Sequence, residues 1–358
     1  MPAKPTLSFA KQNTVVNFLP GPVTIPPDVH AAFCAPAISH RSDQFMSDMQ
    51  ETKRILCDLV GAQHVEILLG SGTLSNDIVA GQLSLLSSPG LVLSHGEFGT
   101  RLINHVQRWQ LPATILRSEW GTTLDYKKIE QLLQQHPEMG WVWSVHCETS
   151  TGILNDIERL KSICKKYEVK LCLDCISSIG NTPVNLQDVY LATAVSGKAL
   201  ASYPGLAMVF YNHTVSPAPE ALPRYLDLAY YAAKDGVPFT ISTNLLYGLR
   251  AALQHIRPAR FDRIEQTTKQ VRDELRTRGF DILAPDQYAS PAVITIVLPE
   301  PIDSVRVGDR LKEEGFLLSY KSYYLVQRNW IQVCVMTDCL LQAVPPLVET
   351  LDMVVNEL

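Results

Sequence analysis

The sequence predicts an α/β protein, in which a large domain with a mostly parallel, doubly wound sheet precedes a smaller α+β C-terminal domain. Two observations lead to this fold class. Short apolar runs alternate with amphipathic helical patterns between residues 65 and 211, as in parallel sheets that are covered by helices. At 358 residues the chain is also too long for one small core, so two domains are expected.

The apolar runs of the large domain end in polar turn clusters, as buried strands do. These runs lie at residues 65–69, 91–93, 113–116, 140–146, 169–173, 190–195 and 206–211. We expect an N-terminal arm over 1–17, the large domain over 18–244 and the small domain over 245–358. A long helical pattern at 245–278, interrupted near Pro258, enters the small domain. Further strands are expected there at 293–297 and 331–335, and helices at 305–314 and 347–356.

The composition excludes several classes of partner. Apolar residues make up 46% of the chain and charged residues 19%, with a net charge of −5. Because no basic stripe is present, we expect neither nucleic acid nor an anionic membrane as the main partner. No apolar run approaches the roughly 20 residues of a membrane span, and the N-terminus lacks the apolar core of a secretory signal. A cytoplasmic location is therefore predicted.

Eight cysteines raise the question of a metal or redox site. Cys172 and Cys175 form a C-x-x-C pattern in or beside a predicted strand, where side chains three positions apart point to opposite faces. No second C-x-x-C or paired histidines complete a metal site. We therefore interpret them as buried thiols and expect no metal.

The first polar cluster follows the run at 65–69. Gly70, Ser71, Gly72 and Thr73 lead from this predicted strand into a helical pattern. The unpaired N–H groups and the dipole of a helix N-terminus bind anions, and a phosphate suits such a turn. The alternative is that Thr73 is a plain N-cap residue, because many strand-to-helix turns have a similar composition.

Two charged residues of opposite sign close two later strands. Asp174 ends the run at 169–173, and Lys198 follows the run at 190–195. Burying either charge without a partner is costly, and ligands of open α/β sheets bind at the carboxyl ends of the strands. Phe98, between Gly96 and Gly99, lies just past another strand end. Its flanking glycines indicate a ring exposed over a ligand, whereas the plainer interpretation is a core aromatic.

One cofactor would use all of these features. Pyridoxal 5′-phosphate (PLP) carries a phosphate for Ser71, Gly72 and Thr73, and a ring that can stack on Phe98. Its pyridine nitrogen needs a buried carboxylate, which Asp174 supplies. Lys198 would form the Schiff base and then move the proton in the reaction.

The ordered set of motifs resembles the class V (fold type I) PLP-dependent aminotransferases. The motifs are PGP, HR, GSGT, HGEFG, HCETSTG, LDC and SGK, and the resemblance extends from about Asn17 to the C-terminus. Within that class the chain is similar to the branch of alanine–glyoxylate, serine–pyruvate and 2-aminoethylphosphonate–pyruvate aminotransferases. The resemblance implies transfer of an amino group from an amino donor to a small 2-oxo acid. It also implies a homodimer with shared active sites.

The resemblance assigns further roles. Lys198 matches the Schiff-base lysine and Asp174 its pyridine partner, while Phe98 and Ile176 match the residues that pack on the two ring faces. Thr149 matches the residue that contacts the phenolic oxygen of the cofactor.

Other matches concern the phosphate and the substrate pocket. Gly72 and Thr73, joined by Ser196, match the phosphate loop, and Gly21 matches the loop that lines the substrate pocket. Thr240 or Thr243 matches a threonine that reaches the phosphate of the partner subunit.

One segment departs from the family pattern. Relatives carry an arginine in a small-domain strand that binds the substrate carboxylate, whereas Gln332 stands there, or Ile331 if the register slips. A neutral amide cannot form the bidentate charged pair that arginine forms. Either another cation replaces it or the substrate is not a standard α-amino acid. The candidate cations are Arg41, Lys321 and Arg328.

Alternative functions follow from this departure. A PLP-dependent lyase or desulfurase-like elimination keeps the cofactor, but its nucleophilic cysteine would need a mobile loop, and Cys334 and Cys339 fall in or beside a strand. A non-catalytic PLP-fold binding protein is the third hypothesis, and the retention of both Asp174 and Lys198 argues against it. A serine hydrolase is disfavoured because G-x-S-x-G is absent around Ser71.

Overall fold

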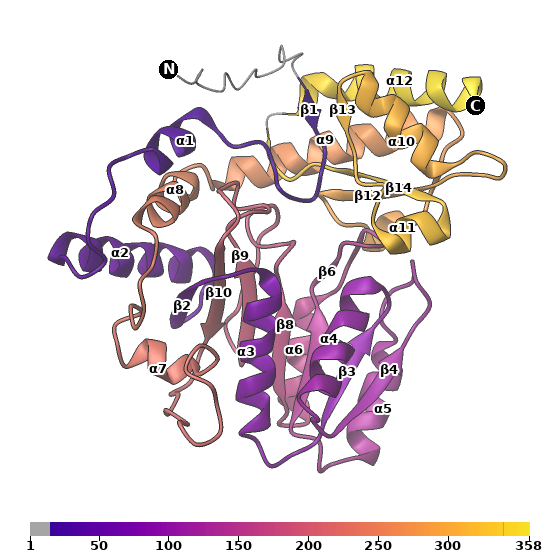
Figure 1. Cartoon of the computed structure of the whole chain (residues 1–358). Coiled ribbons are helices and arrows are strands. Elements are labelled where there is room, and N and C mark those ends of the chain that lie inside the picture. Colours follow the sequence, from indigo (N-terminus) through magenta and orange to yellow (C-terminus); the bar gives the residue numbers. More distant parts are fainter. Residues whose placement is uncertain (1–14, 339) are drawn as a thin grey trace, which may run out of the picture.

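The computed structural model of the chain describes residues 15–338 and 340–358 (Figure 1). A seven-stranded sheet forms the centre of the larger part, in the order β2-β10-β9-β8-β5-β3-β4. The strands are β2 (His64–Leu69), β3 (Gly90–Ser94), β4 (Ala113–Arg117), β5 (Trp141–Val145), β8 (Lys170–Asp174), β9 (Leu191–Val195) and β10 (Leu206–Tyr211). Only β10 pairs antiparallel with its neighbours among these strands. The mixed, mostly parallel sheet confirms the predicted α/β class.

Helices cover both faces of this sheet, as doubly wound topology requires. The helices of the larger part are α1 (Pro27–Phe33), α2 (Asp43–Val60), α3 (Gly72–Ser84), α4 (Glu97–Arg108), α5 (Tyr126–Gln135), α6 (Ile157–Lys166), α7 (Leu228–Ala232) and α8 (Thr243–Leu253). Helices α3, α4 and α7 pack on one face, and α2, α5, α6 and α8 pack on the other. Successive residues of one strand face opposite cores: Val92 faces α3 and α4, whereas Leu91 and Leu93 face the other layer.

The C-terminal part is built on a second, smaller sheet of three antiparallel strands, in the order β11-β12-β14. Its elements are α9 (Pro258–Thr277), β11 (Asp281–Ile282), β12 (Val293–Val297), α10 (Ser304–Glu313), β13 (Phe316–Leu317), α11 (Tyr323–Arg328), β14 (Trp330–Cys334) and α12 (Val344–Glu357). Strand β1 (Val16–Asn17) pairs with β13, and Phe18 is buried in this second core. The segment at residues 16–18 is thus held against the C-terminal part of the chain.

The helical pattern at 245–278 is divided between two helices. Helix α8 ends at Leu253, and α9 begins at Pro258, where proline is tolerated at the first helical position. Leu246 and Leu249 of α8 pack in the core of the large sheet, whereas α9 packs in the second core. The predicted domain boundaries stay predictions, and most of the arm at 1–17 lies outside the described residues. Within the described ranges no helix combines the length and the apolar character needed to cross a membrane.

Candidate functional site

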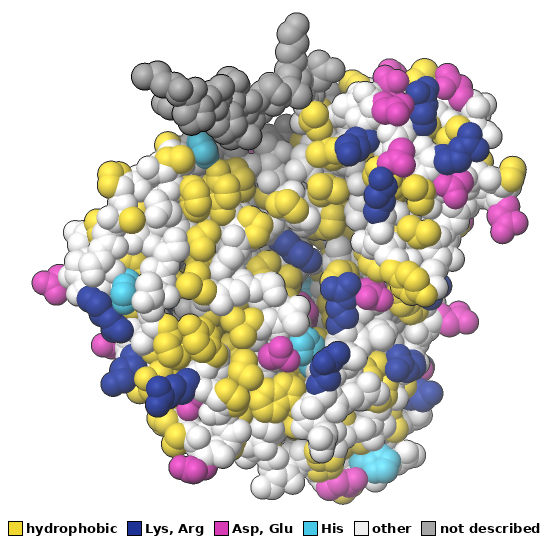
Figure 2. Space-filling view, in the orientation of Figure 1, with side chains coloured by type: hydrophobic (Ala, Val, Ile, Leu, Met, Phe, Trp, Pro, Cys, Tyr) yellow, Lys and Arg dark blue, Asp and Glu magenta, His cyan; other side chains and the backbone are white. Residues whose placement is uncertain are grey.

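The carboxyl ends of the central strands open into one cavity of about 510 Å³. Figure 2 shows the molecule hollowed near the centre of this face, where Lys and Arg side chains gather. Nine residues predicted from the sequence line the cavity, although they come from segments far apart in the chain. They are Gly21, Ser71, Gly72, Thr73, Phe98, Thr149, Asp174, Ile176 and Lys198. The structure therefore brings the predicted phosphate turn, aromatic ring, carboxylate and amine together.

Lys198 follows β9 and reaches the end of β8. Its Nζ donates a hydrogen bond to Ser177 Oγ at 2.9 Å and lies 5.1 Å from the centre of the Phe98 ring. Burial lowers the pKa of the Lys198 ammonium, and the nearby Asp174 charge opposes this shift. A lowered pKa increases the fraction of neutral amine, which is the form that attacks a carbonyl carbon.

Asp174 ends β8 with its side chain 6% exposed. One carboxylate oxygen accepts a hydrogen bond from Asn76 Nδ2 at 2.9 Å, and the other accepts one from the backbone N–H of Ile176 at 3.0 Å. Thr193 in turn donates to Asn76 Oδ1 at 3.1 Å, which fixes the orientation of the amide. Two donors thus hold the carboxylate in place at the cavity wall.

The N-terminus of α3 also lines the cavity. Ser71 is the N-cap residue, but its side chain makes no capping hydrogen bond. A Cβ atom at Gly72 would lie 2.5 Å from Ile176 Cδ1, so glycine lets the turn pack closely against this side chain. Because the first N–H groups of a helix lack partners within the helix, this turn can bind an anion such as a phosphate.

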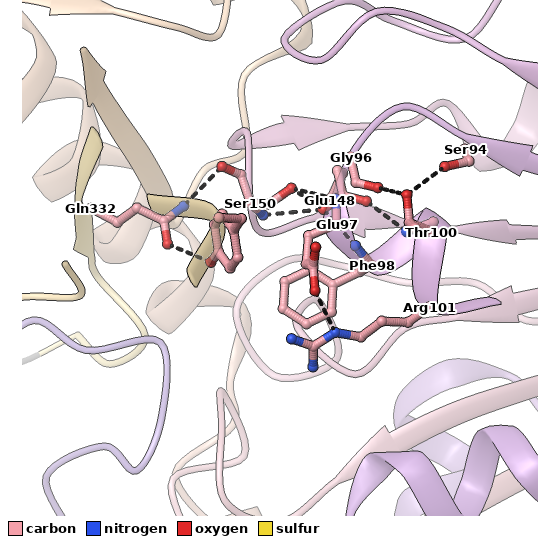
Figure 3. Close-up of polar contacts among 11 residues, drawn as sticks. Ser94, Gly96, Glu97, Phe98, Thr100, Arg101, Glu148, Ser150 and Gln332 are labelled. Atoms are coloured by element: carbon pink, nitrogen blue, oxygen red, sulfur yellow. Dashed lines mark hydrogen bonds and ion pairs between the residues drawn. The ribbon is translucent and has the colours of Figure 1, made fainter. Parts of the chain in front are cut away.

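Glu148 positions Phe98 at the N-terminus of α4. Its carboxylate is fully buried and accepts hydrogen bonds from the backbone N–H groups of Phe98 at 3.2 Å and Gly99 at 2.9 Å (Figure 3). Ser150 Oγ accepts a further one from the N–H of Glu97 at 3.0 Å. Burial raises the pKa of Glu148, while these donors act against that shift.

Thr149 contacts the amine through one intermediate hydroxyl. Its Oγ1 donates to Ser177 Oγ at 2.6 Å, and Ser177 Oγ also accepts the hydrogen bond from Lys198. The three side chains form a continuous polar chain along the cavity wall.

These residues fit PLP. The cavity places an amine, a buried carboxylate and an anion-binding helix terminus around a space bordered by Phe98 and Ile176. Lys198, Asp174 and the turn at 71–73 would hold the three distinct functional groups of the cofactor. Thr149 lines the same cavity, and its hydroxyl would contact the phenolic oxygen.

Several predicted residues lie outside the cavity lining. Ser196 Oγ donates to Tyr203 O at 2.6 Å, so its hydroxyl joins two backbone segments. Thr243 Oγ1 donates to Ile38 O at 2.8 Å, and Thr240 is exposed. Arg41 is also exposed and donates to Val237 O at 3.1 Å. Contacts of Thr240 or Thr243 with a partner subunit stay predictions, since they concern a second chain.

Gln332, on β14, is also outside the lining, and its amide is fully engaged. Nε2 donates to Thr149 O at 2.6 Å, to Ser150 O at 3.2 Å and to Thr295 Oγ1 at 2.9 Å. Oε1 accepts from Tyr324 Oη at 3.1 Å (Figure 3). The glutamine therefore fastens the segment that carries Glu148 to the C-terminal sheet, and the geometry does not favour it as a substrate ligand.

Two other candidate cations are also engaged away from the cavity. Lys321 Nζ lies 2.7 Å from Asp309 Oδ1, and the Arg328 guanidinium stacks 3.9 Å from the centre of the Trp120 ring. Neither lines the cavity.

Replacing Gln332 with leucine is expected to lower the free energy of unfolding by roughly 2–4 kcal/mol, because buried partners of the amide lose their hydrogen bonds. Urea unfolding of both proteins measures the difference. Gln327→Leu, on the exposed side of α11, is the matched control and should change stability by less than about 0.5 kcal/mol. An equal effect of both substitutions would contradict the structural role of Gln332.

Five residues on four separate segments complete the site but were not identified from the sequence. They are Asn76, Arg101, His105, Glu148 and Ser177. Helical spacing carries a partial signal: Arg101 lies four residues after Glu97 and three after Phe98, on the same side of α4. Asn76 lies 98 residues from Asp174, and Glu148 lies 49 residues from Gly99, so no local pattern indicates these contacts.

Comparisons with known proteins agree with this geometry. A model of the family "Aminotransferase class-V" matches residues 29–319. An uncharacterized aminotransferase of Methanocaldococcus jannaschii is 29% identical over 300 residues, which cover 80% of this chain and 78% of that protein. The 2-aminoethylphosphonate–pyruvate transaminase of Pseudomonas putida is 28% identical over 323 residues, covering 86% and 88% of the two chains.

A solved structure is similar over almost the whole length. The ureidoglycine–glyoxylate aminotransferase of Bacillus subtilis superposes with a TM-score of 0.86 at 21% identity, covering 97% of this chain and 94% of that one. At this identity the likeness demonstrates the shared fold. The family match extends over most of the chain, and the chain belongs to the class V aminotransferase family, whose members have the fold type I architecture and depend on PLP.

Proposed function

We propose that the protein moves an amino group from an amino donor to a small 2-oxo acid of the pyruvate or glyoxylate type, by a ping-pong mechanism. The observation that carries this proposal is the meeting of Lys198 and Asp174 in one cavity that the N-terminus of α3 also lines. The name of the Pseudomonas relative, with its pyruvate acceptor, supports the class of acceptor.

The proposed mechanism assigns each residue a separate task. When bound, PLP supplies an electron-accepting ring that makes the Cα proton of the donor removable. Lys198 Nζ is the base that takes this proton and returns it, and its lowered pKa favours the neutral form needed for that task. Asp174 holds a proton on the ring nitrogen, and its two hydrogen-bond donors keep its oxygens oriented.

The remaining residues bind and orient. Ser71, Gly72 and Thr73 bind the phosphate, while Phe98 and Ile176 enclose the ring and exclude water from its faces. Thr149 contacts the phenolic oxygen. We further propose a homodimer in which Thr240 or Thr243 reaches the partner's phosphate, and a cytoplasmic location, as predicted from the sequence.

A panel of donors and acceptors tests the function. We expect the cofactor absorbance to shift when a productive amino donor is added, and to return when a 2-oxo acid such as pyruvate follows. Release of a 2-oxo acid without any acceptor would instead identify an elimination reaction. Tightly bound cofactor with no spectral change on any donor would contradict the proposal and favour a binding protein.

A further inference from the structure

The wall of the cavity that α4 provides carries two basic side chains one helical turn apart, Arg101 and His105. His105 Nδ1 already contacts Asp77 Oδ1 at 2.7 Å, so one side of its ring is engaged. Arg101 is the more available of the two. Its position was not selected from the sequence, and the function proposed above gives it no task.

The Arg101 side chain is held by Glu97 at Nε, whereas the outer part of its guanidinium is available to a ligand. Its Nε donates a hydrogen bond to Glu97 Oε1 at 3.0 Å, one helical turn back, and among the described residues the other guanidinium nitrogens make none. The side chain is 54% exposed. A guanidinium has five N–H donors, so Nη1 and Nη2 are left to bind a planar anion in a bidentate manner.

The guanidinium and the reacting amine line the same cavity and both lie over the Phe98 ring. Its central carbon is 4.8 Å from the centre of the Phe98 ring, and Lys198 Nζ is 5.1 Å from the same centre. Figure 3 shows the Arg101 side chain extending along the Phe98 ring, with the Glu97 carboxylate beside it. A substrate in this cavity is thus bordered by both the Lys198 amine and the Arg101 guanidinium.

The C-terminal sheet does not offer such a cation. Gln332 occupies the place where a family arginine is expected, and its amide is used up by four hydrogen bonds. Among the described residues, two lysine or arginine side chains line the cavity, and they are Lys198 and Arg101.

We propose that Arg101 binds the carboxylate of the 2-oxo acid and of an acidic amino donor, from the α4 side of the cavity. This inference rests on the proposed amino transfer. It names the substrate class as small amino donors and 2-oxo acids that each carry one carboxylate. Glu97 orients the guanidinium through its hydrogen bond to Nε. Its carboxylate also competes with the substrate carboxylate for the positive charge of Arg101.

Binding of propionate and of its neutral isostere propionamide to the PLP-loaded protein, measured by calorimetry, tests the proposal. We expect wild type to prefer propionate. Arg101→Gln should weaken propionate binding by about tenfold, equivalent to about 1.4 kcal/mol, and leave propionamide unchanged. Arg108→Gln is the matched control, since Arg108 lies on the same helix outside the lining and bonds Asn104. It should leave both affinities unchanged.

A second variant gives an effect of opposite sign, which misfolding cannot imitate. Glu97→Gln keeps an acceptor for Arg101 but removes the competing charge, so propionate should bind about two- to fivefold more tightly. Equal propionate affinity in wild type and Arg101→Gln would overturn the proposal, as would a wild type without preference for the acid. A parallel loss of PLP affinity in Arg101→Gln would also overturn it, by assigning the arginine to the cofactor.

Failure of the two proposals can be told apart. If the donor–acceptor panel yields no transfer while Arg101→Gln still loses propionate binding, the anion site stands and the proposed function fails. If transfer occurs and Arg101→Gln retains the wild-type KM for pyruvate, the anion site fails and the proposed function stands.

Discussion

Alanine at position 198 is expected to reduce amino transfer by about 10⁴-fold or more, because the side chain that acts as base and nucleophile is removed. The Lys198 amine has a pKa lowered by burial, so raising the pH through this lowered value increases the neutral fraction. Activity of the wild type should therefore rise with pH over that range. The alanine variant should lose most of the transfer rate, and its remaining activity should no longer rise with pH over this range.

Borohydride treatment followed by peptide mass spectrometry measures the covalent part of this prediction. Wild type should carry the cofactor on the peptide that contains Lys198, and the alanine variant should carry none. Lys170→Ala is the control, since Lys170 begins the strand that Asp174 ends and lies outside the cavity. Cofactor fixed to another lysine in the wild type would refute the assignment.

The central sheet could be predicted because each strand is a separate apolar run. All seven expected runs are strands of the sheet, and their ends differ by at most a few residues. The antiparallel direction of β10 was not predicted, although the chain contains a signal. Residues 196–205, between β9 and β10, contain no helix that could return the chain for a parallel strand, and this short link carries Lys198.

The site was predictable where backbone topology alone determines it. Asp174 and Lys198 meet because their strands are neighbours whose chain ends lie at the same edge. Side-chain direction, in contrast, decides the roles of Gln332 and Arg101. Sequence similarity indicated the position of Gln332 on its strand, but its four hydrogen bonds depend on segments as distant as Thr149. The orientation of Arg101 depends on where α4 begins and on Glu97.

Asp174→Asn is expected to lower the turnover rate by about 10²–10³-fold while the fold is retained, because the amide keeps the shape of the carboxylate without its charge. In the proposed mechanism the charge holds a proton on the cofactor ring, which a neutral amide cannot do. Stopped-flow measurement of the half-reaction separates this loss from any loss of cofactor affinity, which equilibrium dialysis of PLP reports.

A buried carboxylate elsewhere in the sheet serves as the control. Glu66 is 1% exposed and pairs with Lys53 at 2.9 Å, outside the cavity. Glu66→Gln should lower stability but leave the half-reaction rate unchanged. If both substitutions slow the half-reaction equally, Asp174 is important only for folding.

The neighbouring amide allows the charge itself to be tested. Asn76 Nδ2 lies 2.9 Å from Asp174 Oδ2, so the double variant Asn76→Asp with Asp174→Asn moves the carboxylate by about one side chain while keeping the net charge. If the negative charge near the ring nitrogen is the source of the rate, the double variant should recover part of the half-reaction that Asp174→Asn loses. If instead the hydrogen-bond geometry of Asp174 is decisive, the swap should be as slow as the single variant. Either result assigns the rate loss to a specific physical property of one carboxylate.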